Sequence, residues 1–150
     1  AHTLFLDIDG VMHPAGARSD QLFCHRDNLE WVLRAHPAVN VVISSAWRTT
    51  VPLPQIRARF SKDLRRRFVG VTGSISKFPD PSGQRQDECR AWLDSHCPDT
   101  PWIAVDDWLQ GFELDSPHLF LVNPITGLDL STAKELGARI AGLVSTRGHR

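Results

Sequence analysis

The chain has 150 residues, of which 41% are hydrophobic, and both figures suit one domain with a single core. Seventeen basic residues balance seventeen acidic ones, so the overall charge identifies no partner and only local clusters could do so. No apolar run approaches the roughly 20 residues of a membrane-spanning helix, and the spacing of the three cysteines excludes a disulfide framework. We therefore expect one domain over residues 1–150 that carries no signal peptide and works in the cytoplasm.

The first part of the chain predicts two buried strands around a helix. Residues 3–8 form a short apolar run that leads into Asp-Gly turn chemistry, which indicates a strand followed by a tight loop. A helix capped by Asp27 or Asn28 follows the loop and ends before Pro37. Residues 39–43, Val-Asn-Val-Val-Ile, predict the second strand.

The middle of the chain predicts two helices separated by a loop. A helix from about Pro54 to Arg66 carries apolar residues on one face, and a brief strand at 69–71 follows it. Residues 72–83 are rich in Ser, Gly and Pro and predict a loop. The next helix runs from about Arg85 to His96.

The last part of the chain continues the alternation. Residues 102–105 and 118–122 predict strands, and Ser131 caps a final helix. The buried side of this helix is predicted to hold Leu136, Ile140, Leu143 and Val144. Strands that alternate with helices in this way predict an α/β fold, a three-layer Rossmann-like sandwich with a mainly parallel sheet. The stretches 11–27 and 49–72 are too short for a substantial cap domain.

Polar residues follow three of the predicted strands at the edge where parallel sheets bind ligands. Carboxylates gathered there repel one another unless a cation lies among them, and oxygen ligands of this kind are what Mg²⁺ prefers. Each pair by itself also fits ordinary turn or cap chemistry, but together the pairs favour a site. The pairs are Asp7 and Asp9, Ser44 and Ser45, and Asp106 and Asp107.

These segments resemble the motifs of the haloacid dehalogenase (HAD) superfamily. Leu-Phe-Leu-Asp-Ile-Asp-Gly-Val, residues 4–11, is similar to the first motif, and Val-Val-Ile-Ser, 41–44, to the second. Ile-Ala-Val-Asp-Asp, 103–107, is similar to the fourth. The third motif is a basic residue near the start of a helix, for which Arg85 is the choice and Lys77 the alternative.

A narrower resemblance concerns three short segments. Ser-Ser-Ala-Trp-Arg, residues 44–48, together with Arg85 and the Thr-Gly-Leu turn at 126–128, resembles a small bacterial subgroup related to HAD modules of nucleic-acid repair proteins. The resemblance as a whole spans the chain from residue 3 to about residue 144.

The resemblance implies a role for each motif residue. Asp7 is the expected nucleophile, which forms an aspartyl-phosphate, and Asp9 is the expected general acid and base. Ser44, with Ser45 as the alternative, is expected to bind a phosphoryl oxygen, and Arg85 to offset the charge of the intermediate. The expected Mg²⁺ ligands are Asp7, the main-chain carbonyl of Asp9, Asp106 and Asp107.

The acid at position 9 distinguishes among the reactions of the superfamily. A dehalogenase has no need of an acid two residues after the nucleophile, whereas a phosphatase or a phosphomutase does, so Asp9 favours phosphoryl transfer. A phosphomutase usually needs a cap to retain its intermediate, and none is predicted. The expected activity is therefore hydrolysis of phosphate monoesters with Mg²⁺.

Several further residues are candidates for substrate contact. An uncapped site favours large substrates such as a phosphoprotein or a nucleic-acid end, although small nucleotides also fit. The basic segment 57–67 predicts either a phosphate-backbone contact or a solvated helix face. It also supports the alternative function, a noncatalytic nucleic-acid-binding or regulatory module on the same fold. The candidate substrate contacts are His13, Ser45, Trp47, Arg48 and Trp108.

Overall fold

Parallel strands form a central sheet in the computed structural model, which describes residues 1–146. Within these residues the strand order is β3-β2-β1-β4-β5, and each neighbouring pair is parallel. The strands are β1 (His2–Leu6), β2 (Val39–Ile43), β3 (Phe68–Val71), β4 (Trp102–Asp106) and β5 (Leu119–Leu121). The α-helices are α1 (Arg26–Ala35), α2 (Leu53–Arg57), α3 (Gln84–His96) and α4 (Leu130–Thr146). Short 3₁₀ helices lie at Ser19–Gln21, Ala46–Thr49, Lys62–Arg67 and Leu109–Gly111.

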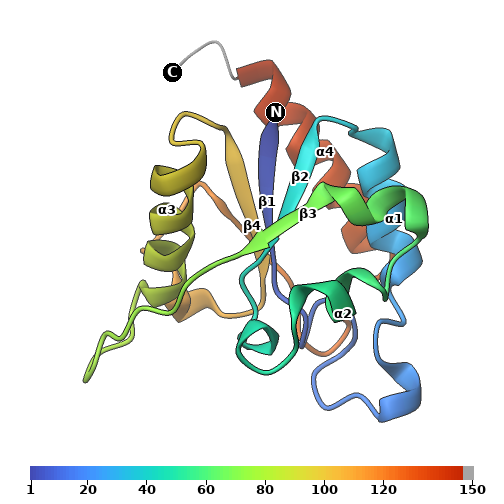
Figure 1. Ribbon diagram of the computed structural model, residues 1–150, viewed down its shortest axis with the longest axis horizontal. Coiled ribbons are helices and arrows are strands. Elements are labelled where there is room, and N and C mark those ends of the chain that lie inside the picture. Colours follow the sequence, from blue (N-terminus) through green and yellow to red (C-terminus); the bar gives the residue numbers. More distant parts are fainter. Residues whose placement is uncertain (147–150) are drawn as a thin grey trace.

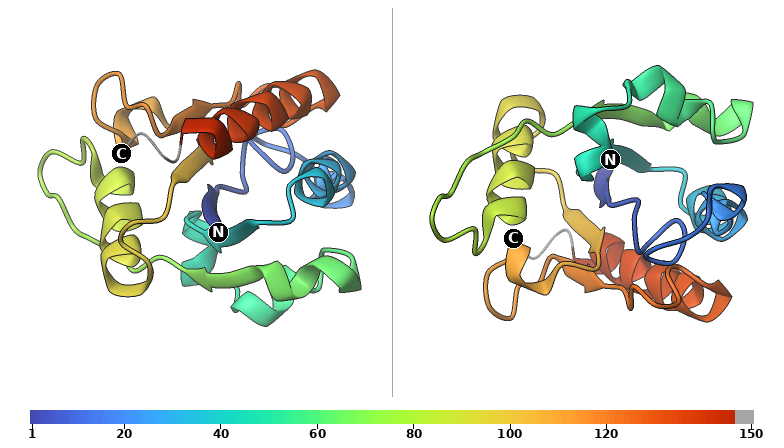
Figure 2. Two further views of the ribbon diagram at one scale, coloured as in Figure 1. Left: turned by 90° about the horizontal axis from the view of Figure 1, so that it is seen from above. Right: turned by 90° about the horizontal axis from the view of Figure 1, so that it is seen from below.

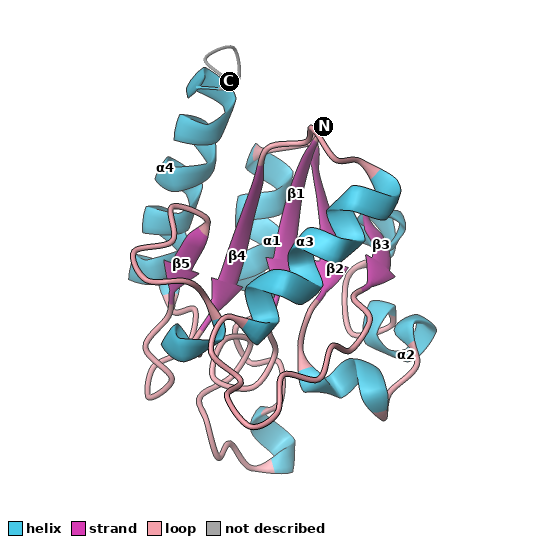
Figure 3. Cartoon of the chain, turned by 90° about the vertical axis from the view of Figure 1, so that its left-hand side faces the viewer, coloured by secondary structure: helices cyan, strands magenta, loops and turns pink. Residues whose placement is uncertain are grey.

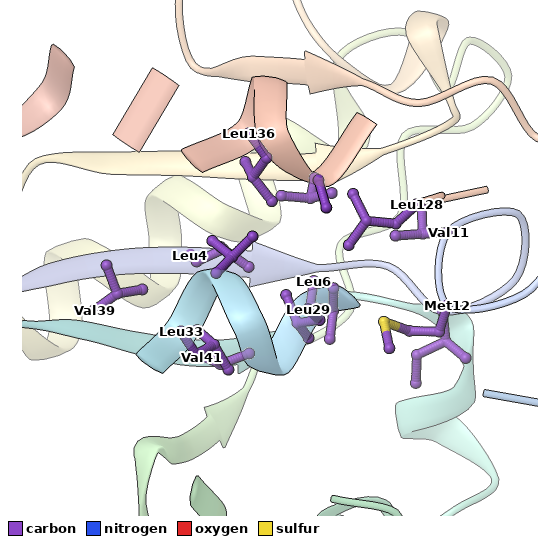
Figure 4. Close-up of a cluster of buried hydrophobic side chains, with 14 of the residues drawn as sticks. Leu4, Leu6, Val11, Met12, Leu29, Leu33, Val39, Val41, Leu128 and Leu136 are labelled. Carbon is purple, nitrogen blue, oxygen red and sulfur yellow. The ribbon is translucent and has the colours of Figure 1, made fainter. Parts of the chain in front are cut away.

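Helices cover both faces of the sheet, so the predicted three-layer α/β fold is confirmed (Figures 1 and 2). Helices α1 and α4 lie against one face, where Leu6 packs in the same apolar cluster as Leu29 and Leu136 (Figure 4). Helix α3 lies against the other face, where Phe5 packs in a cluster with Cys89. Neighbouring residues of β1 face opposite sides because side chains alternate along a strand.

The carboxyl ends of the strands point to the edge where most of the long loops gather (Figure 3). Among residues 1–146, no inserted domain covers this edge, in agreement with the prediction of an uncapped fold. In the same range no helix reaches the length and apolar character needed to cross a bilayer.

The predicted helix over 54–66 is wrong, because the chain breaks between α2 and the 3₁₀ helix Lys62–Arg67. A contact with α1 lies at this break. The carboxylate of Glu30 accepts hydrogen bonds from the Ser61 N–H at 2.8 Å and from Ser61 Oγ at 2.7 Å. The main chain has left the α-helical ladder before this contact, since the Arg59 N–H bonds to the Ile56 carbonyl, and the Ser61 contact keeps its N–H from resuming that ladder.

Two predicted helix caps are also corrected. Helix α4 begins before Ser131, and the carboxylate of Asp129 accepts a hydrogen bond from the Thr132 N–H at 2.9 Å, which makes Asp129 the cap. Helix α1 begins at Arg26, and the Asn28 side chain instead donates to the Leu128 carbonyl at 3.0 Å. The predicted burial of Val144 concerns a side chain outside the described residues.

Candidate active site

The sheet register aligns polar residues at the carboxyl edge. The last residue of β2 pairs with the last residues of β1 and β3, and the last residue of β1 also pairs with Val105 of β4. The next residue of each strand therefore lies at one level, and its N–H continues the parallel ladder. The resulting row across the sheet consists of Asp106, Asp7, Ser44 and Thr72, all of them buried.

The alternation of side chains along each strand determines the face of the sheet to which the side chains of this row point. Phe5, Val42 and Ala104 pack in the apolar cluster beneath α3. Asp7, Ser44 and Asp106 each follow one of these residues by two positions, so their side chains point to the same face of the sheet. The first turn of α3 lies over this face and brings a cation to it.

That cation is Arg85, and its contacts favour it over Lys77 as the predicted basic residue of the third motif. Arg85 Nη1 lies 2.7 Å from Asp106 Oδ2 and 3.5 Å from Asp7 Oδ1. Lys77 instead pairs with Asp87 at 3.0 Å, away from the row. Trp108, a candidate substrate contact, offers its ring to the Arg85 guanidinium, with 5.3 Å between Cζ and the ring centroid.

Three carboxylates crowd together around Asp7. Asp7, Asp106 and Asp107 each offer an oxygen within 4.8 Å of the others. Burial, and after it the nearby Asp106 carboxylate, raises the pKa of Asp7 to about 9, although Arg85 acts in the opposite direction. Burial also raises the pKa of Asp106. A divalent cation would offset this repulsion, and an all-oxygen donor set with few protein ligands fits Mg²⁺.

Gly10 allows Asp107 to join this group. The Gly10 φ is +78°, in the left-handed region that favours glycine, and a Cβ there would overlap Asp107 Oδ2 and crowd Pro124 at 3.2 Å. The glycine of the first motif is therefore needed for the fourth motif to approach it.

The two serines of the second motif have different surroundings. Ser44 Oγ is buried in the row and, within residues 1–146, has no hydrogen-bond partner. Ser45 Oγ accepts a hydrogen bond from the Trp47 N–H at 3.2 Å and caps the 3₁₀ helix Ala46–Thr49. Ser44 is thus the serine whose whole hydroxyl, donor and acceptor alike, is unpaired among the described residues around the buried row, which favours it over Ser45 as the ligand to a phosphoryl oxygen.

Asp9 lies apart from the acidic group. Its carboxylate is 66% exposed and lies 2.8 Å from His13 Nε2. The described residues place only Asp7, Asp106 and Asp107 in the cluster, so an Asp9 carboxylate ligand is not supported and only its main-chain carbonyl remains a prediction. His13 is 1% exposed, and this burial argues against the predicted contact between His13 and substrate.

Two other predicted substrate contacts are engaged with the protein itself. Arg48 donates to the carbonyls of Ser44 at 3.0 Å and Thr72 at 2.9 Å, and its Nη2 lies 3.2 Å from the Glu88 carboxylate. Its side chain is only 7% exposed, so Arg48 holds the loops after β2 and β3 rather than facing substrate. Trp47 packs at the margin of the main core.

Sequence reasoning missed Glu88 and Thr72. Glu88 is 2% exposed and binds Arg48, and its other oxygen accepts a hydrogen bond from the Ile75 N–H at 2.9 Å. The sequence spacing could have indicated both residues. Glu88 follows Arg85 by one helical turn, and Thr72 follows a strand as Ser44 does.

Most arginines of the basic segment 57–67 bind main-chain carbonyls. Arg57 donates to Phe68 O at 2.8 Å, and Arg65 donates to Phe60 O at 2.8 Å. Arg67 donates to the carbonyls of Leu33, His36 and Val39. Arg59 stacks on the Phe23 ring at 4.9 Å, at a groove of about 300 Å³ that Arg26 also lines. The predicted basic face is therefore smaller than its sequence indicates.

Comparison with known proteins adds one finding. A family described as the HAD domain in Swiss Army Knife RNA repair proteins matches residues 3–133, which span the sheet and the first turn of α4. No curated protein and no solved structure gives a significant match. The family match confirms the predicted relationship to the HAD superfamily and covers most of the chain. The chain belongs to the family of HAD domains in Swiss Army Knife RNA repair proteins.

Proposed function

We propose that this chain is a single catalytic domain that hydrolyses phosphate monoesters with Mg²⁺ through an aspartyl-phosphate on Asp7. One observation carries the proposal, the buried row of Asp106, Asp7 and Ser44 with Arg85 lying across two of its carboxylates. A nucleophile, a hydroxyl donor and a cation thus meet at one edge of the sheet. This is the combination that phosphoryl transfer to a carboxylate requires.

The chemistry follows from what each group can do. A carboxylate oxygen of Asp7 attacks the phosphorus atom, and the bond from phosphorus to the ester oxygen breaks while Asp9 gives that oxygen a proton. Asp9 then takes a proton from a water molecule, which attacks the same phosphorus atom and releases Asp7 and inorganic phosphate. Ser44 donates to a phosphoryl oxygen, and Arg85 offsets negative charge throughout.

Asp7, Asp106 and Asp107 would hold Mg²⁺, with the Asp9 carbonyl as a further ligand. When bound, the ion lowers the repulsion between the attacking carboxylate and the phosphate dianion. Burial, and after it the neighbouring Asp106 carboxylate, raises the pKa of Asp7 to about 9, and a carboxylate nucleophile must be ionised at neutral pH. A cation among these carboxylates would supply the needed stabilisation, which supports the assignment.

The substrate class is proposed to be the phosphorylated end of a nucleic acid. The family to which the chain belongs occurs in RNA repair proteins, and an uncapped edge suits a large substrate. The alternative function, a noncatalytic nucleic-acid-binding module, has less support, because most arginines of segment 57–67 already bind carbonyls.

The proposal is tested by phosphate release from aryl phosphate, nucleotides, 3′- and 5′-phosphorylated oligonucleotides and phosphopeptides. We expect turnover that requires Mg²⁺, stops in EDTA and falls by at least about 10³-fold in Asp7→Asn, because the covalent route is lost. Borohydride reduction of the protein during turnover should mark Asp7 and not Asp9.

Asp20→Asn is the matched control, since Asp20 is exposed and pairs only weakly with Arg18 at 3.4 Å. A folded protein that releases no phosphate from any of these esters, yet binds oligonucleotides in a salt-sensitive way, would favour the noncatalytic module instead.

A further inference from the structure

A buried histidine is linked to the exposed acid that follows the nucleophile. His13 lies in the loop after β1, and its ring packs against Phe23 at 5.9 Å and Trp47 at 6.1 Å between centroids. The main chain supports this loop as well, since the Val11 and Met12 N–H groups both donate to the Ile8 carbonyl. The ring is therefore held in one orientation.

Both ring nitrogens of His13 have partners, and together they define the tautomer. Nδ1 lies 3.1 Å from the Phe23 main-chain nitrogen, which can only donate, so Nδ1 acts as the acceptor. The proton of the neutral ring is then on Nε2, which donates to Asp9 Oδ1 at 2.8 Å. The left-handed conformation of Phe23, with φ of 61°, belongs to the turn that presents this N–H.

We propose that His13 is a positioning residue for Asp9, the general acid and base of the proposed reaction. The inference rests on the proposed function and adds to it a residue that does not touch the substrate. By donating to Oδ1, His13 fixes the carboxyl rotamer and leaves Oδ2 free at the exposed edge to meet the ester oxygen.

The exposed Asp9 and the buried His13 have different tasks in this arrangement. Asp9 must reach a bulky substrate and is 66% exposed, so few neighbours restrict its side chain. The hydrogen bond from the buried His13 ring restricts the Asp9 side chain, and the rings of Phe23 and Trp47 hold His13 in place. An acid aimed in advance loses less conformational entropy on reaching the transition state.

Two substitutions separate the two hydrogen bonds. In His13→Asn the amide can occupy the place of Nδ1 and accept from Phe23, but it cannot reach Asp9. In His13→Gln the amide nitrogen can occupy the place of Nε2 and donate to Asp9. The measurement is kcat/KM for an alkyl phosphate and for 2,4-dinitrophenyl phosphate, because only the alkyl leaving group needs a proton from Asp9.

We expect His13→Asn to lose about 10- to 100-fold in kcat/KM on the alkyl phosphate and under about threefold on dinitrophenyl phosphate. His13→Gln should recover most of the loss. Equal losses on both esters, or a Gln variant as impaired as the Asn variant, would overturn the positioning role while leaving the phosphatase intact. Absence of turnover by the wild-type protein on these esters and on the phosphorylated oligonucleotides as well would overturn the proposed function itself.

Nitrogen-15 NMR of the His13 ring tests the contact without catalysis. We expect a protonated Nε2 whose signal shifts in Asp9→Asn, and an unprotonated Nδ1. The opposite tautomer, or an Nε2 signal indifferent to Asp9→Asn, would contradict the hydrogen bond on which the inference depends.

Discussion

At the scale of single residues, the adjacent Ser44 and Ser45 differ in the hydrogen bonds of their hydroxyl groups. Ser44 follows β2 at the level of Asp7 and points beneath α3, whereas the hydroxyl of Ser45 accepts a hydrogen bond from the Trp47 N–H. We expect Ser44→Ala to lower kcat/KM by about 10²-fold with little change in melting temperature, because a donor to the transferring phosphoryl group is removed. Steady-state kinetics on a phosphorylated oligonucleotide would check this.

Ser45→Ala is the matched control. It should lower the free energy of unfolding by about 1 kcal/mol through loss of a cap, and leave kcat/KM near the wild-type value. If Ser45→Ala were the variant that lost turnover, the assignment of the two serines would be reversed.

At the scale of elements, Glu88 joins helix α3 to two loops. One carboxylate oxygen lies 3.2 Å from Arg48 and 3.9 Å from Arg85 Nε, and the other accepts the Ile75 N–H. Glu88→Gln would leave a buried Arg48 without its carboxylate, so we expect a loss of about 3 kcal/mol in the free energy of unfolding and reduced turnover. Denaturant unfolding and phosphate release would measure the two effects.

Lys77→Gln serves as the comparison for Glu88→Gln, because it breaks a more exposed ion pair with Asp87 in the same region. Its cost should not exceed about 1 kcal/mol. Similar costs for both variants would show that the buried carboxylate of Glu88 does not organise the loops.

At the scale of the whole molecule, we expect the carboxylate cluster to make the stability of the fold depend on pH and on Mg²⁺. The folded pKa of Asp7, about 9, exceeds its ordinary value of 3.8, so the fold favours the protonated acid. The stability that the fold gains from the protonated Asp7 is complete below about pH 4 and is lost as the pH rises toward 9. We expect the melting temperature of metal-free wild type, measured in EDTA, to fall relative to Asp7→Asn across this window.

Magnesium should oppose this fall in melting temperature with rising pH, because we expect it to bind the ionised carboxylates. Its stabilising effect on the wild type should therefore grow between pH 6 and pH 9, and should be much smaller in Asp7→Asn. A wild-type melting temperature that runs parallel to that of Asp7→Asn over this pH range would contradict the raised pKa.

Local sequence patterns predicted most of the fold. All of the strands lie within about two residues of their predicted positions, because apolar runs between turn residues carry their own signal. The predicted helix over 54–66 was wrong because the main chain leaves the α-helical ladder after Arg57, and Ser61 then bonds to Glu30, a residue far away in sequence. The predicted caps were wrong for different reasons. Helix α1 begins at Arg26 without a side-chain cap, and Asn28 bonds to the distant Leu128 carbonyl, whereas the nearby Asp129 caps α4 in place of Ser131.

The sequence by itself determined the alternation of strands and helices, the candidate residues at the strand ends and the resemblance to the HAD superfamily. Those features depend on neighbours along the chain. Only the tertiary structure decided that Arg85 rather than Lys77 reaches Asp7. It also decided that Arg48 forms a buried ion pair with Glu88, and that the His13 ring donates a hydrogen bond to Asp9. These outcomes depend on strand register and on helix packing, which bring together groups that no local pattern can pair.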